Sequence, residues 1–132
     1  MADTMQFDLV SPERRLVSVP VREVRLPGTD GDLTAMPGHA ATIVTLRPGI
    51  VTVVDAQGTA TEFAVTGGFA EIGAGGTTVL AERAYPRGAE NRAAIEGHLE
   101  EARKVAPTVA AEHKDSHEKF MDDLTRLLEQ MV

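Results

Sequence analysis

Turn-forming residues recur at short intervals along the first two thirds of the chain, and no stretch between them is long enough for an ordinary helix. Pro-Gly pairs at 27–28, 37–38 and 48–49 separate short segments rich in Val, Ile and Thr. This spacing predicts an antiparallel β-sandwich or barrel and excludes a parallel βαβ sheet. The expected strands are 6–10, 16–19, 22–26, 42–46, 50–55, 62–66, 69–72 and 77–80.

Beyond Gly88 the pattern changes to one typical of helices. Residues 89–105 are dense in Ala, Glu, Arg and Leu, which are good helix formers. Pro107 ends this helix, because a residue before proline is pushed out of the α region, and a second helix is expected from about 108 to 130. The apolar stripes are Ile95, Leu99, Ala102 and Ala106 on the first helix and Phe120, Leu124, Leu127 and Met131 on the second.

The prediction is therefore an N-terminal all-β antiparallel sandwich or barrel over 1–86, followed by a C-terminal αα-hairpin over 87–132. The hairpin is weakly apolar, and its run 112–119 offers almost nothing to bury. Each stripe contributes a few kcal/mol at about 25 cal/mol per Å², against roughly 1–2 kcal/mol of backbone entropy per ordered residue. We expect a hairpin that docks reversibly or is ordered mainly by a partner.

Charge and composition exclude several classes of function. The net charge of −7 argues against nucleic acid and against electrostatic attachment to anionic lipid. The chain has no cysteine, no apolar run near the roughly 20 residues of a membrane span and no secretory signal at its N-terminus. A cytoplasmic protein is expected, without direct lipid insertion, and any membrane association must come through a partner.

Motifs for metal, phosphate or catalytic chemistry are incomplete. The Asp30-Gly31-Asp32 turn has too few carboxylates for a calcium loop. His113 and His117 stand four residues apart, which suits a divalent metal, but no third ligand is evident and a solvated polar face is favoured. The glycine clusters lack the lysine and helix of a phosphate loop, and no Ser/His/Asp order stands out. We expect no catalytic site, no metal and no cofactor.

Three segments resemble the epsilon subunits of bacterial F-type ATP synthases. They are 8–13, 26–49 and 63–84, and the most specific is the block Gly28-Thr29-Asp30-Gly31-Asp32-Leu33 followed by Pro37-Gly38-His39-Ala40. The tail is similar to the family in its charged, alanine-rich, hairpin character. The resemblance implies a non-catalytic central-stalk subunit that binds the gamma subunit and the c-ring and couples proton flow to ATP synthesis. It also implies a peripheral location on the cytoplasmic face of the bacterial inner membrane.

The same resemblance assigns residues to partners. The loop facing the c-ring corresponds to Asp30, Gly31 and Asp32, with Asp32 at the family's acidic position. The candidates for the gamma interface are Met36, Pro37, Gly38 and His39.

Some members of the family sense ATP through a motif at the start of the first tail helix. Arg92 and Ala93 match that motif, but Gly88 replaces its aliphatic residue and Ala89 its aspartate. Losing the carboxylate removes an acceptor for the nucleotide, at about 1–3 kcal/mol for an unpaired buried donor. Arg92 and Ala93 are therefore interpreted as a remnant of a nucleotide-sensing site.

Two alternatives remain open. In the first, the tail extends along gamma and inhibits ATP hydrolysis by contacting the alpha and beta subunits. The Pro107 hinge permits this, whereas the charge of −4 from Ala89 onward, from 6 basic and 10 acidic residues, weighs against it. In the second, the chain is an unrelated small β-sandwich binding module. Its aromatic content of 4% and lack of tryptophan disfavour a carbohydrate site.

Overall fold

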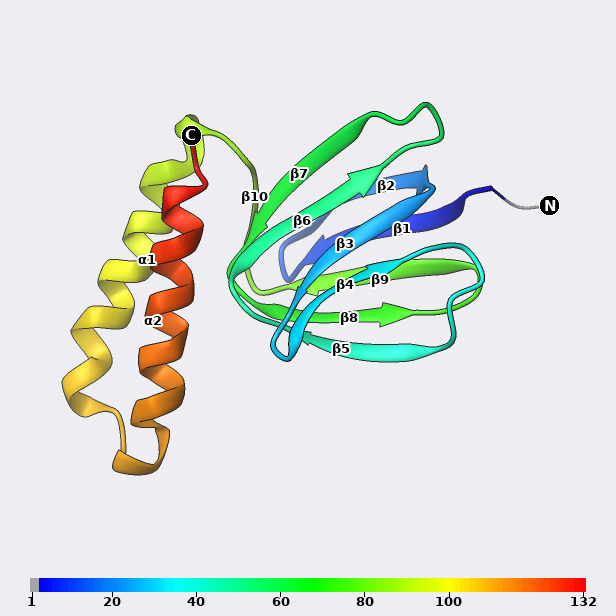
Figure 1. The fold of residues 1–132 in the computed structure, drawn as a ribbon. Coiled ribbons are helices and arrows are strands. Elements are labelled where there is room, and N and C mark those ends of the chain that lie inside the picture. The colour runs from blue at the N-terminus through cyan, green and yellow to red at the C-terminus, as the bar shows by residue number, and fades with distance from the viewer. Residues whose placement is uncertain (1–2) are drawn as a thin grey trace.

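The computed structural model describes residues 3–132, which form a strand-built body and two helices (Figure 1). The strands are β1 Met5–Ser11, β2 Arg14–Val21, β3 Glu23–Gly28, β4 Gly31–Ala35, β5 Thr42–Leu46, β6 Gly49–Val54, β7 Ala60–Val65, β8 Gly68–Ile72, β9 Gly76–Ala81 and β10 Ala84–Pro86. The helices are α1 Arg92–Val105 and α2 Lys114–Glu129, with 3₁₀ turns at Ala89–Asn91, Ala106–Thr108 and Ala111–His113.

The strands form a two-layer sandwich in the order β10-β7-β6-β3-β5-β8-β9-β1-β2, with β4 paired to β3. Strand β3 connects the layers, because it pairs with β6 over its first three residues and with β5 only at Gly28. The predicted antiparallel sandwich is confirmed, and its single parallel pairing within the described chain is β1 with β9. That pairing brings the first strand back beside a strand some seventy residues later.

Alternation along the strands produces the sandwich core. On β1, Met5, Phe7 and Leu9 are buried while their neighbours are more exposed, as expected for a strand with one face inward. The same core takes side chains from strands of both layers, among them Val24, Leu26, Leu46, Val51, Val65, Ala70, Ile72 and Val79. Gly68 begins β8 opposite Ala81 of β9 with φ +130°, and a Cβ there would clash with the Leu80 carbonyl.

Three details of the prediction were wrong. Strands β4 and β10 were not expected, and Gly31 and Asp32, which were expected in a loop with Asp30, begin β4. The second helix begins at Lys114 rather than near 108. Val109 and Ala110 take extended conformations between two 3₁₀ turns, because the chain must reverse direction before α2 can run back along α1.

The helical hairpin docks on the end of the sandwich beside β6 and β10 (Figure 1). Its expected stripes face inward, with Ile95, Leu99 and Ala102 of α1 packed on Leu124 and Leu127 of α2. The sandwich contributes few side chains to this second core, namely Ala64, Ile50 and Tyr85. The hairpin core is therefore made mostly from the hairpin's own residues.

Candidate functional site

The tip of the β3–β4 hairpin is a tight turn that needs glycine on both sides. Gly28 pairs with Gly31 across a turn made by Thr29 and Asp30. Gly31 has φ +130°, and a Cβ on Gly28 would lie 2.5 Å from the Gly31 carbonyl oxygen. The exposed Asp30 consequently stands at the extreme end of the hairpin.

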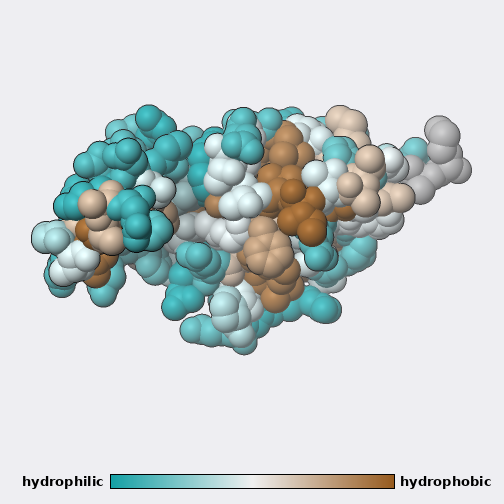
Figure 2. All heavy atoms as spheres, turned by 90° about the horizontal axis from the view of Figure 1, so that it is seen from below, coloured by the Kyte–Doolittle hydropathy of each residue, from teal (hydrophilic) through white to brown (hydrophobic). Residues whose placement is uncertain are grey.

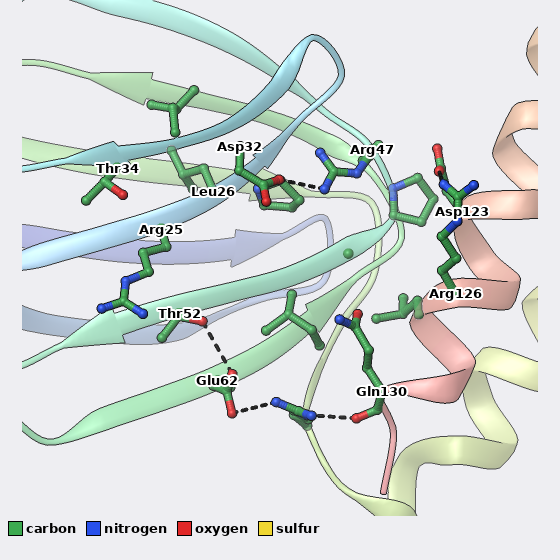
Figure 3. A pocket seen from close by; sticks show the side chains of 17 residues that line it. Arg25, Leu26, Asp32, Thr34, Arg47, Thr52, Glu62, Asp123, Arg126 and Gln130 are labelled. Atoms are coloured by element: carbon green, nitrogen blue, oxygen red, sulfur yellow. Dashed lines mark hydrogen bonds and ion pairs between the residues drawn. The ribbon is translucent and has the colours of Figure 1, made fainter.

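Asp32 is paired within the chain. Arg47, which follows β5, donates from Nη2 to Asp32 Oδ1 at 2.5 Å and from Nη1 to the Gly28 carbonyl at 2.5 Å. The Asp32 side chain is 77% exposed and that of Arg47 is 28% exposed. Figure 3 shows this pair at the side of the hairpin that faces the helices. The two acidic residues of the predicted c-ring loop therefore have different surroundings.

The predicted gamma-interface residues lie at the opposite end of β4. The backbone N–H of Gly38 donates a hydrogen bond to the Ala74 carbonyl at 3.2 Å, which ties this segment to the turn between β8 and β9. The backbone N–H of His39 donates to the Met36 carbonyl at 3.0 Å, and Met36 is 53% exposed. The structure thus does not bring these residues together with Asp30 and Asp32.

An exposed apolar surface was missed by the sequence prediction. On the outer face of the layer containing β5, β8 and β9, Ile43 is 72% exposed and Phe69 is 43% exposed. Phe69 is paired with Leu80 of β9, and Leu80 with Val10 of β1, so these side chains share one face. Figure 2 shows apolar side chains gathered on this side of the sandwich. We call Ile43, Phe69, Leu80 and Val10 the outer apolar row.

The outer apolar row left a faint signal in the sequence. Segment 42–46 reads Thr-Ile-Val-Thr-Leu, with adjacent Ile43 and Val44 that cannot both point into the core. Likewise, Val79 and Leu80 are neighbours on β9, and only Val79 is buried. Apolar residues on both faces of an antiparallel strand indicate that the outer face is covered by something else.

A cleft of about 500 Å³ separates the sandwich from α2 (Figure 3). Its charged lining residues are Arg25, Asp32, Arg47, Glu62, Arg87, Asp123 and Arg126. Across it, Arg87 donates to Glu62 Oε1 at 2.8 Å and to the Gln130 carbonyl at 2.7 Å. These bonds fasten the end of α2 to β7.

Arg92 and Ala93, the interpreted nucleotide-sensing remnant, lie at the start of α1. Arg92 donates from Nη1 to the Leu128 carbonyl at 2.6 Å and lies 3.4 Å from Glu96. A guanidinium at the last carbonyls of α2 is favourable for that helix's dipole. Ala93 is exposed. In this conformation Arg92 is engaged in holding the two helices together.

Two histidines also join the parts of the fold. His98 Nε2 lies 2.8 Å from the Tyr85 hydroxyl, which links α1 to β10. Burial, and secondarily the nearby charge of Arg83, lower the pKa of His98, while Glu101 acts in the opposite direction. His117 donates from Nε2 to the Ala102 carbonyl at 2.7 Å, linking α2 to α1.

The histidine pair considered for metal binding does not converge. His117 points to the Ala102 carbonyl, whereas His113 lies 3.8 Å from Glu112 on the surface. Within residues 3–132, no three His, Cys, Asp or Glu side chains are grouped so as to hold a metal ion. Neither described helix is long and apolar enough to cross a membrane.

The fold and its surfaces define a class of small protein: a β-sandwich with an acidic hairpin tip, an outer apolar row and a docked helical hairpin. Comparison with known proteins gives this class a family. Residues 4–87 match the family described as ATP synthase, Delta/Epsilon chain, beta-sandwich domain. The chain belongs to that family, as its sequence segments predicted.

Relatives agree over nearly the whole length. The chain is 58% identical over 131 residues to the ATP synthase epsilon chain of Paracoccus denitrificans, covering 99% of this chain and 88% of the relative. It is 60% identical over 128 residues to the ATP synthase epsilon chain of Rhodobacter capsulatus, covering 96% of each. The chain is thus a non-catalytic subunit of ATP synthase, a membrane-associated complex. The alternative of an unrelated β-sandwich binding module was wrong.

Solved structures show the same fold. A chain in the cryo-EM structure of the Euglena gracilis mitochondrial ATP synthase, OSCP/F1/c-ring, matches with a TM-score of 0.73 at 22% identity, covering 98% of this chain and 81% of that one. A chain in the central stalk/c-ring structure of the Tetrahymena thermophila mitochondrial ATP synthase matches with a TM-score of 0.64 at 13% identity, covering 95% and 93%. At these identities the likeness shows the fold alone.

Proposed function

We propose that this chain is a rotor subunit of the central stalk that binds the gamma subunit and the c-ring and couples proton flow to ATP synthesis. The observation that carries the proposal is the outer apolar row, together with the acidic hairpin tip on the same rigid sandwich. Two separate surfaces on one rigid body suit a part that must turn with two neighbours at once.

The gamma subunit is assigned to the outer apolar row. Ile43 and Phe69 are large, exposed and on the same face, and exposed apolar side chains that gather on one face are typical of an interaction surface. An interface that holds under torque needs roughly 1,600 Å² of buried surface or more, with an apolar centre. The segment Met36 to His39 precedes β5, and its exposed Met36 is assigned to the same interface.

The c-ring is assigned to the β3–β4 tip. Asp30, Gly31 and Asp32 form a narrow projection whose carboxylates accept hydrogen bonds from basic or backbone donors of a polar loop. Contacts with the c-ring would place the chain peripherally on the cytoplasmic face of the bacterial inner membrane. No lipid insertion is needed, since the partner supplies the attachment.

Reconstitution tests the proposal. Synthase assembled with and without this chain is placed in vesicles, and ATP hydrolysis and proton pumping are measured together. We expect preparations lacking the chain to hydrolyse ATP with little pumping and to regain coupling when it is added back. Proton-coupled synthesis that proceeds equally well without the chain contradicts a coupling role.

A second candidate function is inhibition of hydrolysis by an extended tail. The small share of sandwich residues in the hairpin core favours it, because the hairpin loses few contacts from Ala64, Ile50 and Tyr85 when it leaves. Truncation after Gly88 tests this directly. A rise in ATP hydrolysis by the assembled complex supports inhibition, and an unchanged rate removes it.

A further inference from the structure

The side chain of Arg47 joins both strands of the β3–β4 tip. Its Nη1 donates to the Gly28 carbonyl on β3 and its Nη2 to Asp32 on β4. Its backbone N–H also donates to the Pro27 carbonyl at 2.9 Å. One residue from outside the hairpin therefore contacts it at three points.

Besides Arg47, a backbone hydrogen bond from the Thr29 N–H to the Thr45 carbonyl at 2.9 Å ties the tip to β5. Within the described chain, β4 pairs only with β3, so its far edge has no strand neighbour. Strand β3 itself leaves β6 after Arg25 and meets β5 at the single pair Gly28 and Leu46. A side-chain restraint on β4 therefore adds to the few backbone bonds that hold the outer part of the hairpin.

The backbone that carries Arg47 is tightly packed. Pro48 and Gly49, which follow it, are buried. A Cβ added to Gly49 would lie 2.7 Å from Pro27 Cβ, so the turn between β5 and β6 packs directly on β3. The Arg47 side chain is far less exposed than that of Asp32, at 28% against 77%. The arginine is thus the fixed member of the pair, and Asp32 is held against it.

We propose that Arg47 is a positioning residue for the β3–β4 tip, with Asp32 as its internal partner, and that Asp30 is the carboxylate that contacts the c-ring. This inference rests on the proposed function. Asp30 is exposed, and in residues 3–132 its side chain has no hydrogen bond or ion pair. Its carboxylate oxygens are therefore open to hydrogen bonds from a partner.

Charge neutralisation separates the two roles. A basic donor approaching Asp32 meets the guanidinium of Arg47 beside it, which weakens the attraction and competes for the carboxylate. At Asp30 no such competitor is present among the described residues. The family's acidic position corresponds to Asp32, so this assignment moves the contact two residues along the hairpin, to its end.

Four full-length variants test the assignment: Asp30→Asn, Asp32→Asn, Arg47→Met and the double variant Asp32→Asn/Arg47→Met. Hydrogen exchange at amides 31–33 of the free chain reports the order of the tip. We expect faster exchange in both single variants of the pair, no further increase in the double variant, and wild-type exchange in Asp30→Asn. Equal exchange in all variants would overturn the positioning role.

Binding to a purified complex of gamma with the c-ring gives the second readout. We expect Asp30→Asn to bind roughly tenfold more weakly with an unchanged tip. The loss caused by Asp32→Asn should disappear in the Arg47→Met background. If Asp32→Asn still weakens binding in the Arg47→Met background, and exchange at amides 31–33 is not faster in Asp32→Asn, then Asp32 is the contact and the inference is overturned. Failure of the wild-type chain to bind removes the proposed function itself, while the exchange data still decide the role of Arg47.

Discussion

Tyr85 of β10 and His98 of α1 are joined by a hydrogen bond of 2.8 Å between the phenol hydroxyl and Nε2. The two rings also lie close, with centroids 5.9 Å apart. This contact crosses from the sandwich to the hairpin, so any change that disfavours a neutral His98 also disfavours docking.

Acidification is expected to loosen the docked hairpin. Because burial and Arg83 lower the pKa of His98, the docked state prefers the neutral ring, against the weaker opposing effect of Glu101. This stabilisation is fully present above the ordinary histidine pKa of about 6.5 and is lost as pH falls through the lower docked pKa. Hydrogen exchange of α1 amides at pH 7.5 and pH 5 measures it.

The control for this pH effect is His98→Gln, which can still bond Tyr85 but does not titrate. We expect its α1 exchange, corrected for the intrinsic pH dependence, to change less between the two pH values than that of the wild type. An identical response in both proteins would assign the pH effect to other groups.

Arg87→Met is expected to weaken docking by about 1 kcal/mol. The change removes the bonds to Glu62 and to the Gln130 carbonyl while keeping the aliphatic stem, and the figure is discounted because both side chains are about one-third exposed. Exchange of the last amides of α2 reports the loss. Arg103→Met is the matched control, since among residues 3–132 the Arg103 side chain pairs only with Glu100 on its own helix. Equal effects of the two variants would contradict a role for Arg87 in holding the end of α2 to β7.

Leu124→Ala is expected to loosen the hairpin selectively. Leu124 is fully buried between the helices, and truncation of such a side chain costs about 2–5 kcal/mol. The matched change Leu9→Ala removes an equally buried leucine from the sandwich core. If residues 1–86 and 87–132 are separate units, exchange rises in the helices for the first variant and in the strands for the second. Uniform loss of protection in both would show one cooperative unit.

Phe69→Glu is expected to weaken binding to the gamma subunit at least tenfold. A charge in the middle of the outer apolar row must be desolvated or must exclude gamma from the surface. Titration calorimetry with purified gamma measures the affinity. Thr61→Glu, an exposed substitution on β7 of the other layer, is the control. A similar loss in both variants would point to a general effect of charge instead.

Most strands and the helical hairpin were predictable because their buried positions follow the spacing of apolar residues in the sequence. That spacing is every second residue in the strands and every third or fourth residue in the helices. Strand β4 was not predictable, because Gly-Asp-Leu-Thr-Ala contains a turn residue and an acid, and its pairing with β3 depends on the tight turn at Thr29 and Asp30. The second helix was predicted to begin too early, near 108, because proline permits a new helix to start after it but does not require one.

The surfaces were harder to predict than the fold. Ile43 and Val44 are adjacent and both apolar, so only the sheet pairing decides which one faces out. Asp32 and Arg47 are 15 positions apart in the sequence, and they meet because the end of β3 pairs with the end of β5. No local sequence pattern predicts that contact. The three segments that resemble the family nevertheless identified the part of the chain on which both surfaces lie.

We propose that one face of the sandwich holds gamma while the β3–β4 tip touches the c-ring. Site-specific photocrosslinking in the assembled synthase tests it most directly, with a photoreactive residue placed at Ile43 in one preparation and at Thr29 in another. We predict that the probe at Ile43 attaches to gamma and the probe at Thr29 to the c-ring. Attachment of both probes to the same subunit, or of the Ile43 probe to alpha or beta alone, would contradict the account.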